Sequence, residues 1–71
     1  MSTEVRTEIV GTVWKVVANE GDVVTAGQVI AILECMKMEI PVATEAAGTV
    51  AQLHVTEGQV VQKGDLLATI D

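Results

Sequence analysis

Short apolar segments alternate with glycine-containing turns along the whole chain. Each half has a short alternating segment, a Glu-Gly turn, a valine pair, a second turn at glycine and then an apolar run. The turns lie at Glu20-Gly21, Gly27, Glu57-Gly58 and Gly64. Short segments about 8 to 12 residues apart, with turn signals between them, are typical of an all-β sandwich or barrel. No segment carries an apolar stripe at helical spacing over three turns. The pattern therefore predicts an all-β fold, with glycines where turns need a positive φ.

The second half of the chain repeats the first. Residues 5–34 align with residues 42–71 at a constant offset of 37, and twelve of the thirty pairs are identical, against about two expected by chance. Two copies are too few for a solenoid, which needs about three repeats to bury its faces. The repeat predicts one domain, residues 1–71, made of two similar halves about an approximate two-fold axis. The connector 35–41 occurs once.

Equivalent positions in the two halves also predict the core. Alternation in the segments before each Glu-Gly turn directs every second side chain to one face. The expected core residues are Val16, Ala18, Val24, Ile30, Leu53, Val55, Val61 and Leu67. Trp14, the one aromatic residue, stands where the other half has Ala51, and we expect it to pack partly buried. His54 is expected to face solvent from within a strand, without a catalytic role.

Size, charge and cysteine content exclude several classes of function. A chain of 71 residues is too short for a substrate domain plus a cofactor domain. A net charge of −6 disfavours binding to nucleic acid or to anionic membrane surfaces. The longest apolar run, residues 29–33, falls far short of the roughly 20 residues of a membrane-spanning helix.

The single cysteine and the N-terminal sequence suggest a compartment. Cys35 alone can form neither an internal disulfide nor a zinc site, which needs about four ligands. The first four residues have no basic or apolar signal region. We therefore expect a cytoplasmic protein with no metal site.

The connector carries the candidate site. Lys37 lies between Met36 and Met38, with Glu34 and Glu39 outside them. An ordinary solvated turn is the simplest interpretation of such a segment. Against it, exposed methionines are unfavourable unless a partner or ligand covers them, and methionine is favoured on surfaces that must adapt to partners. The offset also maps Lys37 onto the region of the chain ends, which predicts that it lies at the opposite pole from both termini.

The connector sequence resembles a known modification signature. Residues 34–39, Glu-Cys-Met-Lys-Met-Glu, are similar to the attachment signature of biotin carboxyl carrier domains, which usually reads Glu-Ala/Ser-Met-Lys-Met. The resemblance covers nearly the whole chain, including Glu-Gly-Asp at 20–22, Gly-Gln at 27–28 and Glu-Gly at 57–58. In length and near-bare ends the chain looks like the small stand-alone biotinylated proteins, also called biotin/lipoyl attachment proteins.

The resemblance implies a fold, and this chain departs from the family at two places. The family fold is a flattened barrel of two four-stranded antiparallel sheets, with the modified lysine on an exposed hairpin between the halves. Cys35 stands where alanine or serine is usual. Residues 18–20 leave no room for the thumb insertion of some acetyl-CoA carboxylase carriers.

The resemblance also implies a function. Lys37 would carry covalent biotin added by biotin protein ligase, with Met36 and Met38 as recognition flanks. The motif neighbours are Glu34, Cys35 and Glu39. The chain would be a non-catalytic, monomeric carrier that serves biotin carboxylase and carboxyltransferase on other chains.

Two other functions remain open. A lipoyl carrier has the same fold but usually carries Asp-Lys-Ala at this place, so the Met-Lys-Met sequence argues against it. An unmodified interaction or regulatory module would use the methionine-rich turn as a docking surface.

Overall fold

The computed structural model describes residues 2–71, which form eight strands and two sheets. The strands are β1 (Thr3–Arg6), β2 (Gly11–Val16), β3 (Val23–Val24), β4 (Val29–Cys35), β5 (Met38–Ala43), β6 (Gly48–Leu53), β7 (Val60–Val61) and β8 (Leu66–Ile70). One four-stranded sheet has the order β5-β4-β2-β7 and is called here the hairpin sheet; the other, β1-β8-β6-β3, is the terminal sheet. All neighbouring strands are antiparallel. The predicted all-β fold of two four-stranded antiparallel sheets is confirmed.

An approximate two-fold symmetry relates the two sheets. Strands β2 and β6, and likewise β3 and β7, are related by the offset of 37 residues. The same offset relates β1 to β5 and β4 to β8. When each strand of the hairpin sheet, β5-β4-β2-β7, is replaced by its equivalent, the result is β1-β8-β6-β3, the strand order of the terminal sheet. Each sheet therefore takes two strands from each half of the chain, and neither half can complete a sheet by itself.

The turns use glycine as the sequence predicts. Gly21 and Gly58 have φ values of 92° and 91°, and Gly27 and Gly64 have 89° and 91°. The Gly21 amide donates a hydrogen bond to the Val50 carbonyl, and the Gly58 amide donates one to the Val13 carbonyl. Because each bond joins one half of the chain to the other, these turns help to hold the two halves together.

The core lies between the sheets and consists of branched aliphatic side chains. Of the predicted core residues, Ala18, Val24, Ile30, Val55, Val61 and Leu67 are buried. Val16 and Leu53 are half-buried and pack against the core. The prediction missed further buried residues, among them Val5, Val13, Leu33, Val50, Ala68 and Ile70.

A β-bulge in β2 explains the position of Trp14. Val13 pairs with Leu33 and Lys15 pairs with Ile32, so Trp14 is the extra residue of the bulge. Its side chain is 47% exposed, and Lys15 Nζ lies 5.6 Å from the centroid of its ring. The expectation that Trp14 packs partly buried is wrong, because the bulge turns both residues outward.

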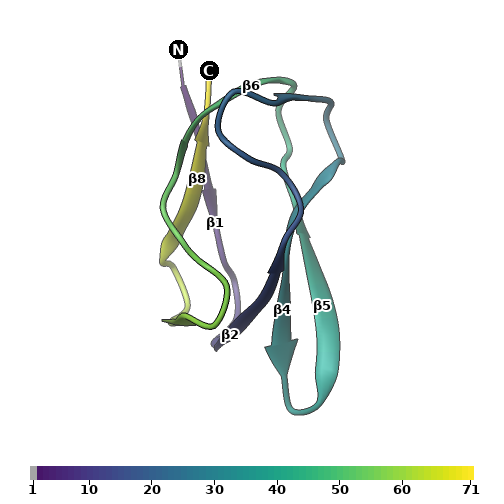
Figure 1. Ribbon diagram of the computed structural model, residues 1–71, viewed down its shortest axis with the longest axis vertical. Helices are drawn as coiled ribbons and strands as arrows, with labels where there is room; N and C mark the ends of the chain where they lie inside the picture. The colour runs from purple at the N-terminus through teal and green to yellow at the C-terminus, as the bar shows by residue number, and fades with distance from the viewer. Residues whose placement is uncertain (1) are drawn as a thin grey trace.

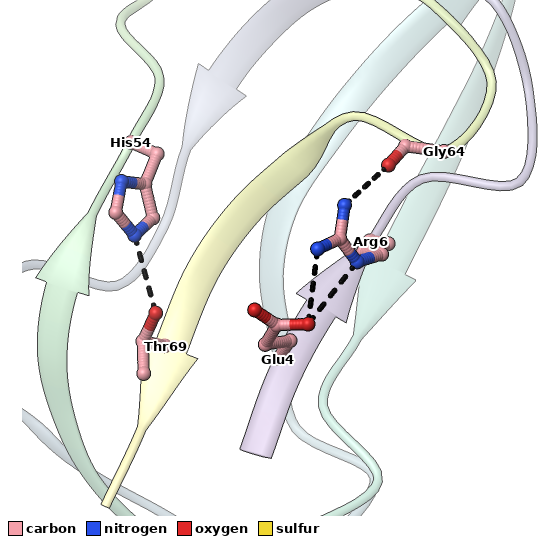
Figure 2. A network of polar contacts seen from close by, with 5 residues as sticks. All are labelled: Glu4, Arg6, His54, Gly64 and Thr69. Carbon is pink, nitrogen blue, oxygen red and sulfur yellow. Dashed lines mark hydrogen bonds and ion pairs between the residues drawn. The ribbon is translucent and has the colours of Figure 1, made fainter. Parts of the chain in front are cut away.

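His54 lies on the outer side of the terminal sheet. It follows the last residue of β6, so its expected place within a strand is wrong by one position. Its side chain is exposed, as expected, and its Nε2 lies 3.1 Å from Thr69 Oγ1 (Figure 2).

The hairpin of β4 and β5 projects from one end of the molecule. The molecule measures 33 × 18 × 17 Å, and the hairpin turn lies at one end of its longest axis (Figure 1). The start of β1 and the end of β8 lie together at the other end, where Thr3 pairs with Ile70. The predicted placement of the Lys37 turn opposite both chain ends is thus confirmed. Residues 2–71 include no helix long and apolar enough to cross a membrane.

Candidate functional site

Met36 and Lys37 alone form the turn between β4 and β5. The strands pair in register up to Cys35 and Met38, which leaves two residues in the loop. The φ angles of Met36 and Lys37 are 52° and 64°. Positive φ at both central residues is the pattern of a type I′ hairpin turn, for which Asn-Gly is the preferred sequence. For side chains other than glycine, a left-handed backbone costs about 1–2 kcal/mol per residue. The surrounding sheet therefore holds the turn in an unfavourable conformation.

The hairpin is anchored in the centre of its sheet. Strand β4 pairs with β5 on one side and with β2 on the other. Within it, Leu33 is completely buried and lies opposite the half-buried Ile40. The turn thus stands on a rigid support, and this keeps its side chains in a defined position.

The side chains at the tip are exposed to solvent. Met36 is 89% exposed and Met38 is 64% exposed. Lys37 is also exposed, and within residues 2–71 its amine forms neither an ion pair nor a hydrogen bond. The amine is therefore accessible as a nucleophile for acylation, between two apolar side chains that a partner can cover.

The other predicted site residues lie at the base of the tip. Glu34 and Glu39 are direct cross-strand partners, and both are exposed. Like charges in that arrangement repel each other, and neither carboxylate has a salt-bridge partner within residues 2–71. Cys35 is a free, half-buried thiol opposite Met38. The structure thus gathers all six predicted residues at one end of the hairpin sheet.

The site is a protrusion and not a pocket. An open groove lies elsewhere, between the edge strands β1 and β5, and its lining includes Glu4, Arg6, Ile40 and Pro41 but none of the predicted site residues. Among residues 2–71, no three His, Cys, Asp or Glu side chains are placed to hold a metal ion. The arrangement suits chemistry that takes place in the active site of another protein.

Sequence reasoning did not anticipate the backbone conformation of the turn. Neither methionine nor lysine favours positive φ, so residue propensity gives no signal for it. The register of the flanking strands gives the signal, since it leaves two residues to reverse the chain.

Comparison with known protein families identifies the class of the chain. Residues 2–70 match the model of the biotin/lipoyl family, described as biotin-requiring enzyme. The chain belongs to this family. It is a biotin/lipoyl domain with a cross-sheet two-fold symmetry and an exposed lysine turn.

Two of the relatives with similar sequences are named as a biotinylated protein and a biotin/lipoyl attachment protein, and a third is a subunit of a carboxyltransferase. Biotinylated protein TB7.3 of Mycobacterium tuberculosis is 57% identical over 42 residues, which is 59% of each chain. The biotin/lipoyl attachment protein of Bacillus subtilis is 51% identical over 35 residues, or 49% of this chain and 48% of that protein. The methylmalonyl-CoA carboxyltransferase 1.3S subunit of Propionibacterium freudenreichii is 50% identical over 36 residues, or 51% of this chain and 29% of the subunit. The matches thus span 59% or less of these relatives.

The fold also matches small parts of large carboxylases. The urea carboxylase of Kluyveromyces lactis contains a segment with a TM-score of 0.94 and 37% identity, covering 100% of this chain and 6% of that enzyme. A single-chain, multi-domain long-chain acyl-CoA carboxylase matches with a TM-score of 0.89 and 38% identity over 96% of this chain and 7% of its own. The chain is therefore similar to biotinylated proteins and to a small part of two large carboxylases.

Proposed function

We propose that this chain is a biotin carboxyl carrier in which Lys37 bears covalent biotin. The observation that carries the proposal is the exposed, unpaired amine of Lys37 at the tip of a left-handed turn, between two exposed methionines. Family membership supports biotin as the attached group. We assign Met36 and Met38 the role of recognition flanks, with Glu34, Cys35 and Glu39 as their neighbours.

Attachment needs only an accessible lysine. The ε-amine attacks the activated carboxyl carbon of biotinyl-adenylate, an amide bond forms, and AMP leaves. The amine must give up a proton in this step, and in this proposal the biotin protein ligase provides the group that accepts it. The carrier contributes the shape of the turn and no catalytic base.

The carrier then serves transport and orientation. Bound biotin supplies a ureido nitrogen that accepts a carboxyl group in the biotin carboxylase and releases it in the carboxyltransferase. The turn between β4 and β5 lies at one end of the 33 Å axis, so a group attached to Lys37 could enter an active site while the body of the domain stays outside. The domain, residues 1–71, acts as one unit, and the connector 35–41 joins its half-repeats 5–34 and 42–71.

Partners must release the carrier at each step. We therefore propose transient complexes with the ligase, the biotin carboxylase and the carboxyltransferase, and a monomeric carrier between them. We place the reaction in the cytoplasm, because a free thiol next to the attachment site persists in a reducing compartment.

Intact-mass spectrometry after incubation with biotin, ATP and a biotin protein ligase tests the proposal. We expect one biotinyl increment on the wild-type protein and none on Lys37→Arg. Lys15→Arg and Lys63→Arg are matched controls that should keep the increment. A folded wild-type protein that stays unmodified by an active ligase contradicts the proposal. A parallel incubation with lipoate and a lipoate ligase tests whether the chain is a lipoyl carrier instead, which would show as a lipoyl increment in mass. The name of the Bacillus subtilis relative, biotin/lipoyl attachment protein, is the reason for this second incubation.

A further inference from the structure

The sulfur atoms of the described residues lie together at one end of the molecule. Among residues 2–71, the sulfur-containing side chains are Cys35, Met36 and Met38, at the end of the hairpin of β4 and β5 (Figure 1). The core contains none of them, because its buried side chains are valine, isoleucine, leucine and alanine, with two threonines. Within residues 2–71, an agent that reacts with sulfur therefore acts at the proposed attachment site and not on the core.

The two methionines are open to solvent, whereas the thiol is partly covered. Met36 is 89% exposed and Met38 is 64% exposed. Cys35 is half-buried, and a Cβ atom added at Gly11 would lie 3.7 Å from its Cβ atom, so the start of β2 lies against it. Small reactive molecules can therefore reach both methionine side chains without any opening of the fold.

Packing within the chain gives no reason for methionine at these two positions. Methionine typically fills gaps in a core, where oxidation to the sulfoxide disrupts the packing. Here neither Met36 nor Met38 belongs to the core or packs against it. Leucine would offer a partner a similar apolar surface, but only methionine can change reversibly between an apolar and a polar side chain.

We propose that Met36 and Met38 form a reversible oxidation site that controls whether Lys37 can be modified. The inference rests on the proposed function. A lone pair of the thioether sulfur attacks one oxygen of hydrogen peroxide, the O–O bond breaks, an S–O bond forms and water leaves. The sulfur is oxidised by two electrons and the peroxide is reduced. Methionine sulfoxide reductases return the thioether with a dithiol as the reductant, which becomes a disulfide while the oxygen leaves as water.

The oxidised turn presents polar side chains where the proposed contact with the ligase is apolar. A sulfoxide oxygen is a hydrogen-bond acceptor, and it loses its bound water when a partner covers it. An apolar surface supplies no donor in exchange, so the complex with the ligase becomes weaker. The fold does not change, because neither methionine is packed in the core. Oxidation thus acts on the loading of the carrier and not on its stability.

The test treats the unbiotinylated protein with hydrogen peroxide and then measures its reaction with a biotin protein ligase. Tandem mass spectrometry should locate one added oxygen atom on each of Met36 and Met38, and the thermal midpoint should not change. We expect kcat/KM in the ligase reaction to fall about tenfold or more. Methionine sulfoxide reductases A and B, supplied with dithiothreitol, should restore it, because each enzyme reduces one sulfoxide epimer. Dithiothreitol alone should not.

A matched variant assigns the effect to these two side chains. Met36→Leu/Met38→Leu removes both thioethers and keeps apolar flanks, and it retains Met1, Trp14 and Cys35 as other sites of oxidation. Each protein is compared with its own untreated form, so a lower starting rate of the variant does not affect the result. We expect peroxide to change kcat/KM of the variant by less than about twofold. If the variant reacts too slowly to measure, recovery of the wild-type protein with the reductases decides the question.

The possible results separate this inference from the proposed function. Wild-type protein that is oxidised at both methionines and biotinylated at the untreated rate overturns the inference alone, and so do methionines that peroxide leaves unoxidised. Recovery with dithiothreitol alone, or no recovery with the reductases, assigns the loss to another group such as Cys35 and overturns it as well. An equal loss in the leucine variant, or a lower thermal midpoint after oxidation, has the same meaning. Untreated wild-type protein that an active ligase leaves unmodified overturns the proposed function and the inference together.

Discussion

The backbone amide of Leu53 donates a hydrogen bond of 2.9 Å to Oε2 of Glu20, which lies in the other half of the chain. The symmetric bond runs from the Val16 amide to Oε2 of Glu57, at 3.2 Å. Both acceptors belong to the Glu-Gly turns, and both donors lie at the ends of the bulged strands β2 and β6. Each glutamate thus ties its turn to the opposite half of the molecule.

Removing either carboxylate should weaken the fold. We expect Glu20→Ala and Glu57→Ala each to lower the free energy of unfolding by about 1 kcal/mol, because an amide loses its charged acceptor at the surface. Urea denaturation measures the change. Glu8→Ala, which removes an exposed carboxylate without such a bond, is the control. A loss no greater than that of the control contradicts the role of these bonds.

The left-handed turn should limit the stability of the domain. Met36→Asn/Lys37→Gly installs the preferred residues for φ angles of 52° and 64°, and we expect it to raise the free energy of unfolding by about 1–2 kcal/mol. The same variant should no longer accept biotin. Lys63→Gly, a substitution in another exposed turn, controls for the loss of a lysine and should not stabilise. A domain that is no more stable with Asn-Gly would show that the turn is unstrained.

The Glu-Gly turns should tolerate only glycine well. At Gly21 and Gly58, with φ near 90°, a Cβ atom meets no other atom within 4 Å, so backbone strain alone opposes a larger residue. We expect Gly21→Val and Gly58→Val each to cost about 1–3 kcal/mol, measured as a lower thermal midpoint. Ala47→Val adds the same type of side chain at an exposed position without positive φ. Midpoints equal to that of this control would refute the strain argument.

The methionines should matter to the ligase and not to the fold. Met36 and Met38 are 89% and 64% exposed, so truncating them removes little from the core. Burying a methionine in a partner contributes about 1.5 kcal/mol or more, which corresponds to roughly tenfold in kcat/KM. We expect that loss for Met36→Ala or Met38→Ala in a ligase assay, at an unchanged thermal midpoint.

A second exposed residue provides the control for the methionines. Val23 is 77% exposed and lies in β3, which belongs to the terminal sheet and not to the sheet that carries the turn. Val23→Ala should leave the ligase reaction unchanged. If all three variants react at the wild-type rate, the methionines are not recognition flanks.

The repeat made much of the fold predictable from the sequence, but the β-bulges made it harder to predict which side chains face the core. Alternation that directs Val16 and Ala18 inward would also place Trp14 on the inner side of the strand. In the structure an extra residue enters β2 between Val13 and Lys15, so the inward side chains are Val13 and Val16. A bulge depends on the pairing with β4, which local sequence does not encode.

Local sequence also could not predict which strands of one half pair with strands of the other half. The repeat predicts equivalent strands but not their partners, because pairing depends on tertiary packing. In the structure β7 joins β2, and β3 joins β6, across the two halves. The position of Lys37 was predictable. The two-fold operation maps the connector onto the chain ends, so the Lys37 turn and the chain ends must lie at opposite poles of the molecule.

The most direct test of the account is the modification state of the protein isolated from its own cells. Proteolysis followed by tandem mass spectrometry locates any added mass among Lys15, Lys37 and Lys63. We expect a biotinyl group on Lys37 alone, with a fraction of the protein unmodified when biotin is scarce. An unmodified Lys37 in biotin-replete cells, or biotin on either of the other two lysines, would contradict the central claim that this turn is the attachment site.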